Sequence, residues 1–438
     1  MTLSIVHRGG IADVTAGNPL RHVFLTERAA RHPPELAGIE PRPIRSAAVV
    51  GGGTMGVGIA AALRSACLPL VLIERDHAAV EGALARLRAL FDGAVKRGRI
   101  SAGLAAERMA GVTGSTDWAA LAEADLIIEA VFEDLDVKRG VFQSVAAVCR
   151  EDAILATNTS YLDPERIAEG IGGPERFLGL HFFSPAQVMK LVEIVPTHAT
   201  APEVLATGFA LARMLNKIPV RAGISDGFIG NRLLRVTRMQ AERLLLSGAT
   251  PAGVDAAMRA FGLPMGPFEA QDLGGLDIAA SQRRTARARG ETPFAPVADR
   301  LAAIERFGQK SGGGWYDYAP GDRTPRPSAT VARIIAEEAQ GWPGRDWNDA
   351  SMVECILWPM VNEAARTIED RTALRAADID LVEIHGYGFP RWRGGPMYYA
   401  EARGLDGVVA ALSAMAEEGF AEPPCGRLFQ AAARGRFS

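Results

Sequence analysis

A histidine and a glutamate in this sequence are placed so that they could move a proton together. His181 ends an apolar, strand-like segment, FLGLH, and Glu193 lies twelve residues later inside another, LVEIV. A carboxylate inside an apolar strand is costly to bury unless it is paired. We therefore expect Glu193 to bind His181, fixing the imidazole tautomer and stabilising its protonated form, as the orienting group of a general base does. The structural alternative is that His181 satisfies only local packing and that Glu193 faces solvent across the pleat.

Other polar residues follow the apolar runs ADLIIEAV and AILAT. Glu133 and Lys138 come just after the first run, and the tripeptide NTS, ending in Ser160, follows the second. Open parallel sheets bind ligands at the carboxyl ends of their strands, so these residues could line one site. A hydroxyl group such as that of Ser160 and the imidazole of His181, at neighbouring strand ends, could hold one alcohol oxygen from two sides.

Three glycines, Gly51, Gly53 and Gly56, fit the pattern G-x-G-x-x-G between an apolar strand and a small-residue helix. The first glycine permits a tight turn, the second lets a pyrophosphate approach the backbone, and the third lets the helix pack closely on the strand. Glu74, 23 residues after Gly51, is placed to accept the ribose hydroxyls. A lone glycine turn is weak evidence, but with this strand, helix and acid it predicts a dinucleotide site.

These residues need a scaffold that brings strand ends together, and residues 46–224 have its pattern. Short apolar strands alternate with helices there, which predicts an α/β domain with a Rossmann-type, doubly wound parallel sheet covered on both faces. The expected strands are 47–50, 69–73, 124–131, 153–157, 177–181, 191–195 and 218–221, and the expected helices include 78–97 and 202–215.

The remaining sequence is predicted to be helical, apart from a short N-terminal segment. Residues 249–277 resemble residues 374–406, because both have Val/Ile-Asp in a short helix, then Gly-x-Pro, Gly-Pro and Gly-Leu-Asp. This repeat predicts two tandem all-α C-terminal domains, at 225–325 and 326–438. Residues 1–45 are expected to form one helix, at 21–32, and a proline-rich linker on the surface.

Composition excludes several classes of function. The net charge of −3 gives no reason to expect a nucleic acid or a membrane surface as partner, and no apolar run is long enough to span a bilayer. The N-terminus lacks the pattern of a secretory signal, and the four cysteines are scattered, so we expect a cytoplasmic protein. No His or Cys spacing predicts a metal site, and neither a phosphate-binding loop of the GxxxxGK[ST] type nor a GxSxG nucleophile motif is present.

Taken in order, several motifs resemble those of the L-3-hydroxyacyl-CoA dehydrogenases of fatty-acid β-oxidation. They are GGGTMGVGIA, IEAVFEDLDVKRGVF, ATNTSYL, GLHFFSPAQVMKLVEIV, DGFIGNRLL, GQKSGGGWYDY and GYGFPRWRGGPMYYA. The resemblance covers about residues 20–438 and is greatest to the dehydrogenase half of the multifunctional β-oxidation enzymes. Residues 22–32 and 41–45 resemble the linker that follows the enoyl-CoA hydratase half in those fusions, so we expect a free-standing dehydrogenase half.

The resemblance implies a role for each residue that matches a family motif. His181 would be the general base that takes the proton of the 3-hydroxyl group while hydride passes from C3 to NAD, and Glu193 would be its partner. Ser160 and Asn231 would hydrogen-bond the substrate oxygen. Residues on the cofactor side would be Gly51, Gly53, Thr54, Met55, Gly56, Glu74, Glu133, Lys138, Ser184 and Lys310. No metal is implied.

Two departures from the family pattern limit what can be carried over. Ser184 stands where many members have asparagine, so a hydroxyl replaces an amide near the nicotinamide. The Ser and Lys that hold CoA in short-chain members fall near Ala83 and Leu90, which leaves the CoA contacts and the chain length open. Glu74 would repel a 2′-phosphate, so we expect NAD rather than NADP, although Arg75 follows it.

Alternatives remain at this level. The chain could be a related β-hydroxyacid dehydrogenase of another pathway, or a non-catalytic NAD-binding subunit that partners a separate enoyl-CoA hydratase. Docking of such a hydratase on the N-terminal helix is also compatible with activity. A monomer is expected, because the second helical copy could occupy internally the surface through which single-domain relatives dimerise.

Overall fold

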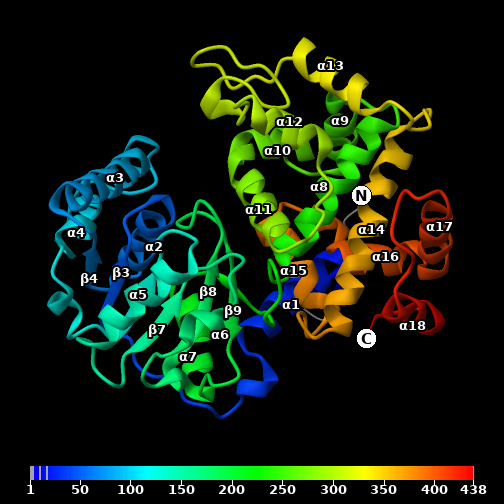
Figure 1. The fold of residues 1–438 in the computed structure, drawn as a ribbon. Helices are drawn as coiled ribbons and strands as arrows, with labels where there is room; N and C mark the ends of the chain where they lie inside the picture. The colour runs from blue at the N-terminus through cyan, green and yellow to red at the C-terminus, as the bar shows by residue number, and fades with distance from the viewer. Residues whose placement is uncertain (1–3, 9–10, 16–17, 438) are drawn as a thin grey trace. The chain divides into compact units, whose positions relative to one another are not determined.

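The computed structural model describes residues 4–8, 11–15 and 18–437, and the chain divides into two compact units. The first unit comprises Met1–Asn231 together with Asp370–Tyr387, and the second comprises Arg232–Glu369 and Gly388–Ser438. Figure 1 shows the sheet of the first unit with its flanking helices, and the helices of the second unit. A segment from the second sequence repeat therefore belongs with the sheet.

An eight-stranded sheet forms the centre of the first unit, in the order β10-β9-β8-β7-β6-β3-β4-β5. All neighbouring strands are parallel except β8 and β9, which the short connection at residues 183–190 joins as an antiparallel pair. The chain reverses its direction of winding where β3 neighbours β4 on one side and β6 on the other, which is where such sheets bind ligands. The strands are β3 (Ala47–Val50), β4 (Leu70–Ile73), β5 (Val112–Ser115), β6 (Leu126–Glu129), β7 (Ile154–Thr157), β8 (Phe177–Phe182), β9 (Leu191–Pro196) and β10 (Ile218–Arg221).

Helices cover both faces of this sheet because its strands are apolar on both sides. Val49 and Ile128 pack with α2, α3 and α7 on one face, whereas Ala48 and Ile127 pack with α5 and α6 on the other. This alternation along each strand is the period-2 pattern of a sheet buried on both faces. The helices are α2 (Thr54–Ser65), α3 (His77–Lys96), α4 (Ala102–Ala110), α5 (Leu135–Ala146), α6 (Pro164–Ala168) and α7 (Pro202–Met214), with short 3₁₀ turns at Pro34–Leu36, Trp118–Leu121 and Pro174–Arg176.

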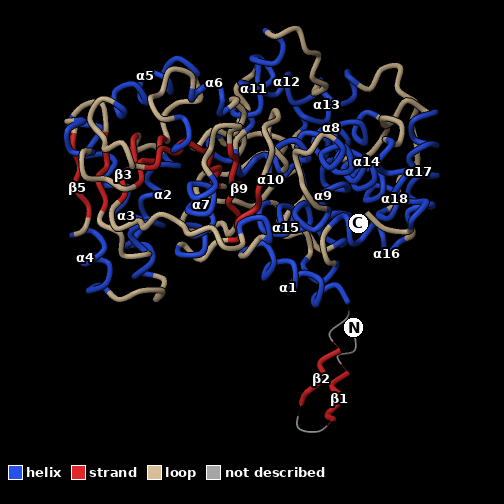
Figure 2. The backbone as a smooth tube through the Cα atoms, turned by 90° about the horizontal axis from the view of Figure 1, so that it is seen from below, coloured by secondary structure: helices blue, strands red, loops and turns tan. Residues whose placement is uncertain are grey.

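The N-terminal helix is α1 (Asn18–Arg31), which includes most of the predicted helix and starts earlier. It contacts β10 and α15 (Ala376–Gly386). Two histidine–carboxylate pairs join the helices, since His22 Nε2 lies 2.8 Å from Asp380 Oδ2 and His385 Nε2 lies 2.8 Å from Glu27 Oε1. Before α1, an antiparallel hairpin of β1 (Ser4–Arg8) and β2 (Ile11–Thr15), red in Figure 2, was not expected from the sequence.

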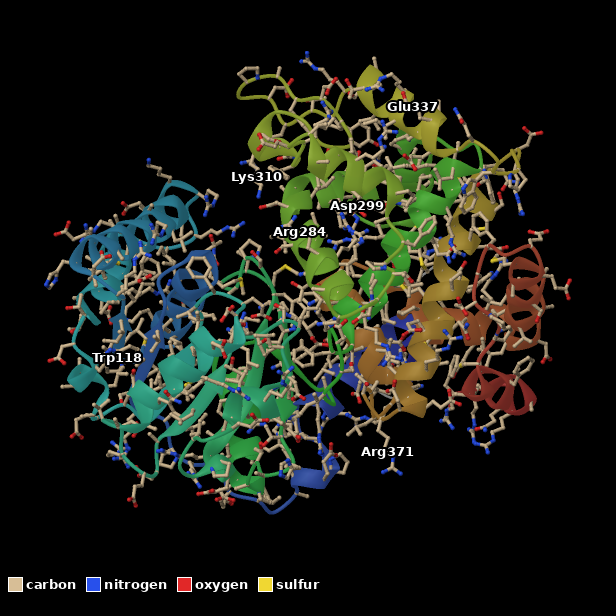
Figure 3. The ribbon with its side chains drawn as sticks, in the orientation of Figure 1. Trp118, Arg284, Asp299, Lys310, Glu337 and Arg371 are labelled. Atoms are coloured by element: carbon tan, nitrogen blue, oxygen red, sulfur yellow. The ribbon has the colours of Figure 1, made fainter. Side chains whose placement is uncertain are left out.

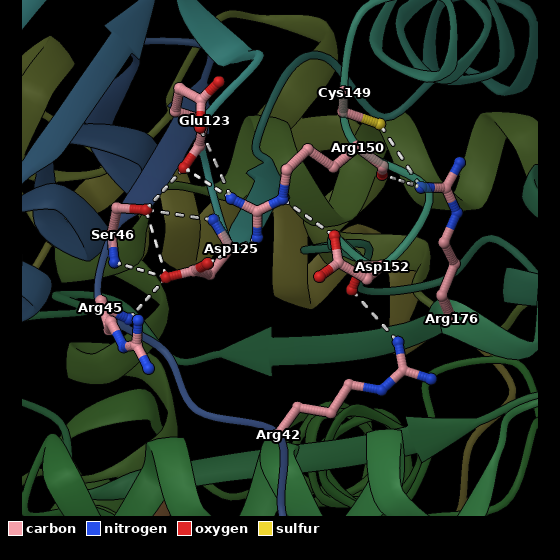
Figure 4. A network of polar contacts seen from close by, with 9 residues as sticks. All are labelled: Arg42, Arg45, Ser46, Glu123, Asp125, Cys149, Arg150, Asp152 and Arg176. Atoms are coloured by element: carbon pink, nitrogen blue, oxygen red, sulfur yellow. Dashed lines mark hydrogen bonds and ion pairs between the residues drawn. The ribbon is translucent and has the colours of Figure 1, made fainter.

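A polar network fixes the end of the linker to the start of the sheet (Figure 4). Asp125, which precedes β6, accepts hydrogen bonds from the backbone N–H groups of Arg45 at 2.7 Å and Ser46 at 3.0 Å. Arg150, which precedes β7, donates to Asp125 at 2.7 Å and to Asp152 at 2.9 Å. These residues precede β6 and β7, so the network lies at the amino ends of the strands, opposite to the carboxyl ends where ligands are expected.

The second unit is helical throughout its named elements. Its helices are α8 (Gly230–Leu246, whose first two residues belong to the first unit), α9 (Pro251–Phe261), α10 (Pro267–Gly274), α11 (Leu276–Ala288), α12 (Pro296–Ala303), α13 (Ala329–Glu338), α14 (Asp349–Glu369), α16 (Pro396–Arg403), α17 (Leu405–Glu417) and α18 (Gly426–Arg434), with 3₁₀ turns at Gln309–Ser311 and Arg391–Arg393. The order α9, α10, α11 recurs as α15, α16, α17, although α15 belongs to the first unit, and the two tandem helical domains stay a prediction. Among the described residues, no helix has the length and apolar character needed to cross a membrane.

Candidate active site

His181 and Glu193 form a buried pair across two strands. They are directly opposite each other in the antiparallel ladder of β8 and β9, so their side chains point to the same face. His181 Nδ1 lies 2.7 Å from Glu193 Oε2. The histidine is 4% exposed and the glutamate is not exposed at all. This contact occupies Nδ1 and leaves Nε2 as the ring nitrogen that could take a proton from a substrate.

The second oxygen of Glu193 accepts hydrogen bonds from the start of α8. Glu193 Oε1 lies 3.1 Å from the backbone N of Ile229 and 3.0 Å from that of Gly230. These N–H groups have no partner within the helix, and the helix dipole favours a negative charge there. Both oxygens of Glu193 therefore have polar contacts, and the side chain joins His181 to the start of the helix that carries Asn231.

Aromatic rings enclose the imidazole. The Phe183 ring centroid lies 4.5 Å from that of His181, and the Phe228 centroid lies 5.6 Å from it. Beside them, Asn231 Oδ1 accepts a hydrogen bond of 3.1 Å from the hydroxyl of Tyr387, which follows α15. Apolar walls of this kind exclude water and strengthen electrostatic interactions at the ring nitrogens.

Ser160 lies in the loop after β7, and His181 lies near the carboxyl end of the neighbouring strand β8. Glu133 fixes this loop, because its Oε1 accepts hydrogen bonds from Thr159 Oγ1 at 2.6 Å, Ser160 N at 2.8 Å and Tyr161 N at 2.9 Å. Burial raises the pKa of Glu133, but the charge of Lys138 and these donors outweigh burial, so the pKa lies below its usual value. Glu133 therefore has a structural contact with the Ser160 loop.

Lys138 belongs to a buried ion pair whose other member, Glu129, was not singled out from the sequence. Lys138 Nζ lies 2.7 Å from Glu129 Oε1, and neither side chain is exposed. Thr157 Oγ1 donates to Glu129 Oε2 at 2.6 Å, and Glu133 Oε2 lies 3.5 Å from Lys138 Nζ. Glu129 ends the apolar strand LIIE, so the rule that drew attention to Glu193 would also have found it. A contact of Lys138 with the cofactor stays a prediction.

The glycine turn has the form that a dinucleotide requires. Gly51 has a φ of +99°, and a Cβ on Gly56 would lie 1.8 Å from the carbonyl oxygen of Gly51. Gly53, the N-cap of α2, has no atom within 4 Å of a Cβ position, so the space before the helix is open. Thr54 and Met55 begin α2, whose first N–H groups face that space. These residues fit a pyrophosphate.

Glu74 lies beside this turn, directly after β4. Its Oε1 accepts a hydrogen bond of 2.8 Å from the backbone N of Gly52, and its Oε2 one of 3.1 Å from that of Arg75. Arg86 of α3, which the sequence did not single out, donates from Nη2 to the Gly52 carbonyl oxygen at 2.8 Å. The acid is thereby fixed at the turn, where it could accept ribose hydroxyls.

The two remaining residues predicted on the cofactor side are Ser184 and Lys310. Ser184 is exposed, two residues beyond the end of β8. Lys310 lies in the helical unit (Figure 3), where its Nζ is 2.6 Å from Asp277 Oδ1. Within the described part of the chain, no group of three or more His, Cys, Asp or Glu side chains could hold a metal ion.

A second buried carboxyl group, Glu383 of α15, interacts with Glu193. Burial raises the pKa of Glu383 to about 8, and the negative charges of Glu193 and Asp380 act in the same direction. A carboxyl group in this environment is mostly protonated at pH 7. No sequence pattern singles out Glu383, because its segment is predicted to belong to a separate helical domain.

Two models of one protein family match this chain. The model described as 3-hydroxyacyl-CoA dehydrogenase, NAD binding domain, matches residues 46–225, and the model described as 3-hydroxyacyl-CoA dehydrogenase, C-terminal domain, matches residues 227–318. The two matches together span more than half of the chain.

Individual proteins show the same similarity. The peroxisomal bifunctional enzyme of Cavia porcellus is 35% identical over 442 residues, which is 95% of this chain but only 60% of that protein. The crystal structure of 3-hydroxybutyryl-CoA dehydrogenase from Escherichia coli K12 is similar with a TM-score of 0.78 at 29% identity, over 90% of this chain and 99% of that chain. The dehydrogenase part of multifunctional enzyme 1 from C. elegans is similar with a TM-score of 0.68 at 28% identity, over 92% of this chain and 95% of that chain.

Proposed function

Because the chain belongs to the 3-hydroxyacyl-CoA dehydrogenase family, we propose that it catalyses the NAD-dependent oxidation of (3S)-3-hydroxyacyl-CoA to 3-oxoacyl-CoA, and the reverse reaction. The observation that carries this proposal is the buried contact between His181 Nδ1 and Glu193 Oε2. A histidine with a purely structural role does not need a buried carboxylate that is itself held by two backbone amides. A general base becomes positively charged during the reaction, so it needs such a carboxylate to stabilise that charge.

The proton is handled by His181. In the oxidation direction, Nε2 takes the proton of the 3-hydroxyl group, and the positive charge that develops on the ring is stabilised by Glu193 through Nδ1–H. Bound NAD⁺ would accept the hydride, with its two electrons, from C3. The proton and the hydride together account for the two hydrogens removed when the alcohol becomes a ketone.

The substrate oxygen is held by Ser160 and Asn231 in this proposal. Ser160 is fixed by the hydrogen bond from its backbone N to Glu133. Asn231 is fixed by its position in the first turn of α8, directly after Gly230, whose backbone N–H donates to Glu193. Donors fixed before the reaction stabilise the charge that develops on the oxygen without reorganisation. The glycine turn would hold the pyrophosphate and Glu74 the adenosine ribose.

The test is NADH oxidation with acetoacetyl-CoA and longer 3-oxoacyl-CoAs. The wild type should be active, and His181→Ala should lose at least about 10²-fold, the lower end of the contribution of a positioned general base. His198→Ala is the matched control, because His198 also contacts a glutamate, Glu165, but is exposed. Activity that His181→Ala leaves unchanged would contradict the mechanism, and an inactive wild type would contradict the proposed function.

We also propose that a separate enoyl-CoA hydratase docks on α1, the segment that resembles the linker of the fused enzymes. Leu20, Phe24 and Leu25 are 39%, 60% and 49% exposed on this helix, whereas Val23 and Ala30 are buried. Sedimentation of the protein with a purified hydratase should detect a complex that Phe24→Asp weakens. Phe429→Asp, which changes another exposed phenylalanine, should not weaken it. No complex with the wild type would contradict this proposal.

A further inference from the structure

The residue that follows α15 reaches the proposed substrate-binding amide. The Tyr387 hydroxyl donates a hydrogen bond of 3.1 Å to Asn231 Oδ1. Its ring lies against the start of α8, where a Cβ on Gly230 would be 2.8 Å from Tyr387 Cε2 and 2.9 Å from its hydroxyl oxygen. Only a glycine at position 230 leaves room for this approach.

The same ring also supports the enclosure of His181. Tyr387 and Phe183 pack edge to face, with centroids 5.7 Å apart, and Phe183 in turn packs on His181 at 4.5 Å. Gly386 allows this arrangement, because a Cβ there would lie 2.8 Å from Leu191 Cδ2. Tyr387 is thus in contact with a neighbour of the base and with the proposed oxygen-binding residue.

The internal repeat shows that a helix such as α15 can end without the hydroxyl group of Tyr387. When the two copies are aligned on their Gly-x-Pro motifs, Phe261 of the first copy corresponds to Tyr387. Phe261 packs on Phe389 and Tyr399 with centroids 5.6 Å and 5.3 Å away. The hydroxyl therefore occurs in the copy that lies beside Asn231.

We propose that Tyr387 is a positioning residue for the reaction: its hydroxyl fixes the side-chain amide of Asn231 so that the NH₂ group faces the substrate oxygen. This inference rests on the proposed function. An amide has one acceptor and one donor end, and the substrate carbonyl needs a donor. With Oδ1 held by Tyr387, the amide presents Nδ2–H to the substrate, whereas a rotated amide would present an acceptor to an oxygen.

Contacts of α15 with α1 hold this arrangement in place. His22 and Glu27 of α1 pair with Asp380 and His385 of α15. Since Tyr387 directly follows α15, the N-terminal helix supports the residue that orients Asn231. The chain thereby uses a helix of the second sequence repeat to complete a site built on the sheet.

The experiment compares Tyr387→Phe with wild type in the reduction of acetoacetyl-CoA. Negative charge grows on the substrate oxygen as hydride arrives, so a donor there acts mostly on kcat. We expect kcat to fall about three- to tenfold, as the loss of one neutral hydrogen bond implies, with a smaller change in KM. Calorimetric titration with acetoacetyl-CoA gives a readout that needs no turnover, and binding should weaken by no more than the change in KM.

The control and a double mutant separate positioning from folding. Tyr399→Phe also removes a tyrosine hydroxyl from the second repeat, and it should leave kcat and the melting temperature unchanged. In an Asn231→Ala background, Tyr387→Phe should have no further effect on kcat, because the two residues act through one interaction. If Tyr387→Phe equals wild type in an active enzyme, or costs the same factor with and without Asn231, the inference is refuted. An inactive wild type would instead refute the proposed function.

Discussion

Glu193→Gln tests the central pair most directly, because it removes a charge while keeping the shape of the side chain. Glu193 Oε1 accepts from two backbone amides at 3.1 Å and 3.0 Å, and Oε2 faces His181 Nδ1 at 2.7 Å. A glutamine can satisfy both amides only with its carbonyl oxygen, so its NH₂ group then points at Nδ1. The imidazole must turn Nδ1 into an acceptor and carry its proton on Nε2, which is the wrong tautomer for a base.

The expected loss in kcat follows from these contacts. A hydrogen bond to a charged group contributes about 1.5–3 kcal/mol, which the protonated imidazole would lose, and the tautomer change adds to that cost. We expect kcat to fall about 10²- to 10⁴-fold, the upper figure being what the corresponding Asp→Asn change costs in a Ser-His-Asp triad. NADH binding should change little, because Glu193 lies on β9 and the glycine turn follows β3.

The assay is steady-state reduction of acetoacetyl-CoA, with NADH binding followed by fluorescence and folding by thermal melting. Glu165→Gln is the matched control, since it alters an exposed histidine–glutamate contact, to His198 at 2.9 Å, and should keep wild-type kcat. A Glu193→Gln protein that is folded and binds NADH but retains kcat within about threefold would refute the orienting role.

Three other changes have defined outcomes. Burial raises the pKa of Glu383 to about 8, so the folded state binds this proton more tightly than the unfolded state does. The stability associated with this proton is therefore lost as pH rises from about 4.5 to about 8. The melting temperature of Glu383→Gln should accordingly rise relative to that of wild type between pH 5 and pH 8.5. Lys138→Met leaves Glu129 buried without its cation, so it should lower the free energy of unfolding, measured in urea, by about 3–5 kcal/mol. The additional change Glu129→Gln should make this loss smaller. In fluorescence titrations, Glu74→Ala should weaken NADH binding about tenfold and reduce the preference for NADH over NADPH. An unchanged preference for NADH would contradict the assignment of Glu74.

Some contacts near the sheet could be predicted because they follow from the local sequence, such as the need of a buried charge for a partner. The family, the α/β sheet followed by a helical region, and the NAD-binding domain are confirmed. The pairing of Glu193 with His181 followed from the cost of burying a charge, and the structure places the two at 2.7 Å. The same rule applied to Glu129 would have predicted its pair with Lys138. The roles of these residues toward substrate and cofactor stay predictions.

Contacts made by α15 could not be predicted in this way. Its sequence places it in the second helical repeat, yet it packs on α1, β9 and β10 of the first unit. The apolar pattern of a helix shows which side is buried but not which partner buries it. Tyr387 and Glu383 were therefore missed, although the difference between Phe261 and Tyr387 in the aligned repeats was visible in the sequence.

Glu383 is a second buried carboxyl group near the proposed base. The carboxyl groups of Glu193 and Glu383 repel each other, and like charges at close range cannot both ionise easily. Glu193 contacts the ring of His181 through one oxygen and the backbone N–H groups of Ile229 and Gly230 through the other. Glu383 is buried beside Glu193 and Asp380, which favours its protonated form. Because burial and the neighbouring negative charges keep the proton on Glu383 at neutral pH, α15 places a neutral carboxyl group near Glu193 instead of a second negative charge.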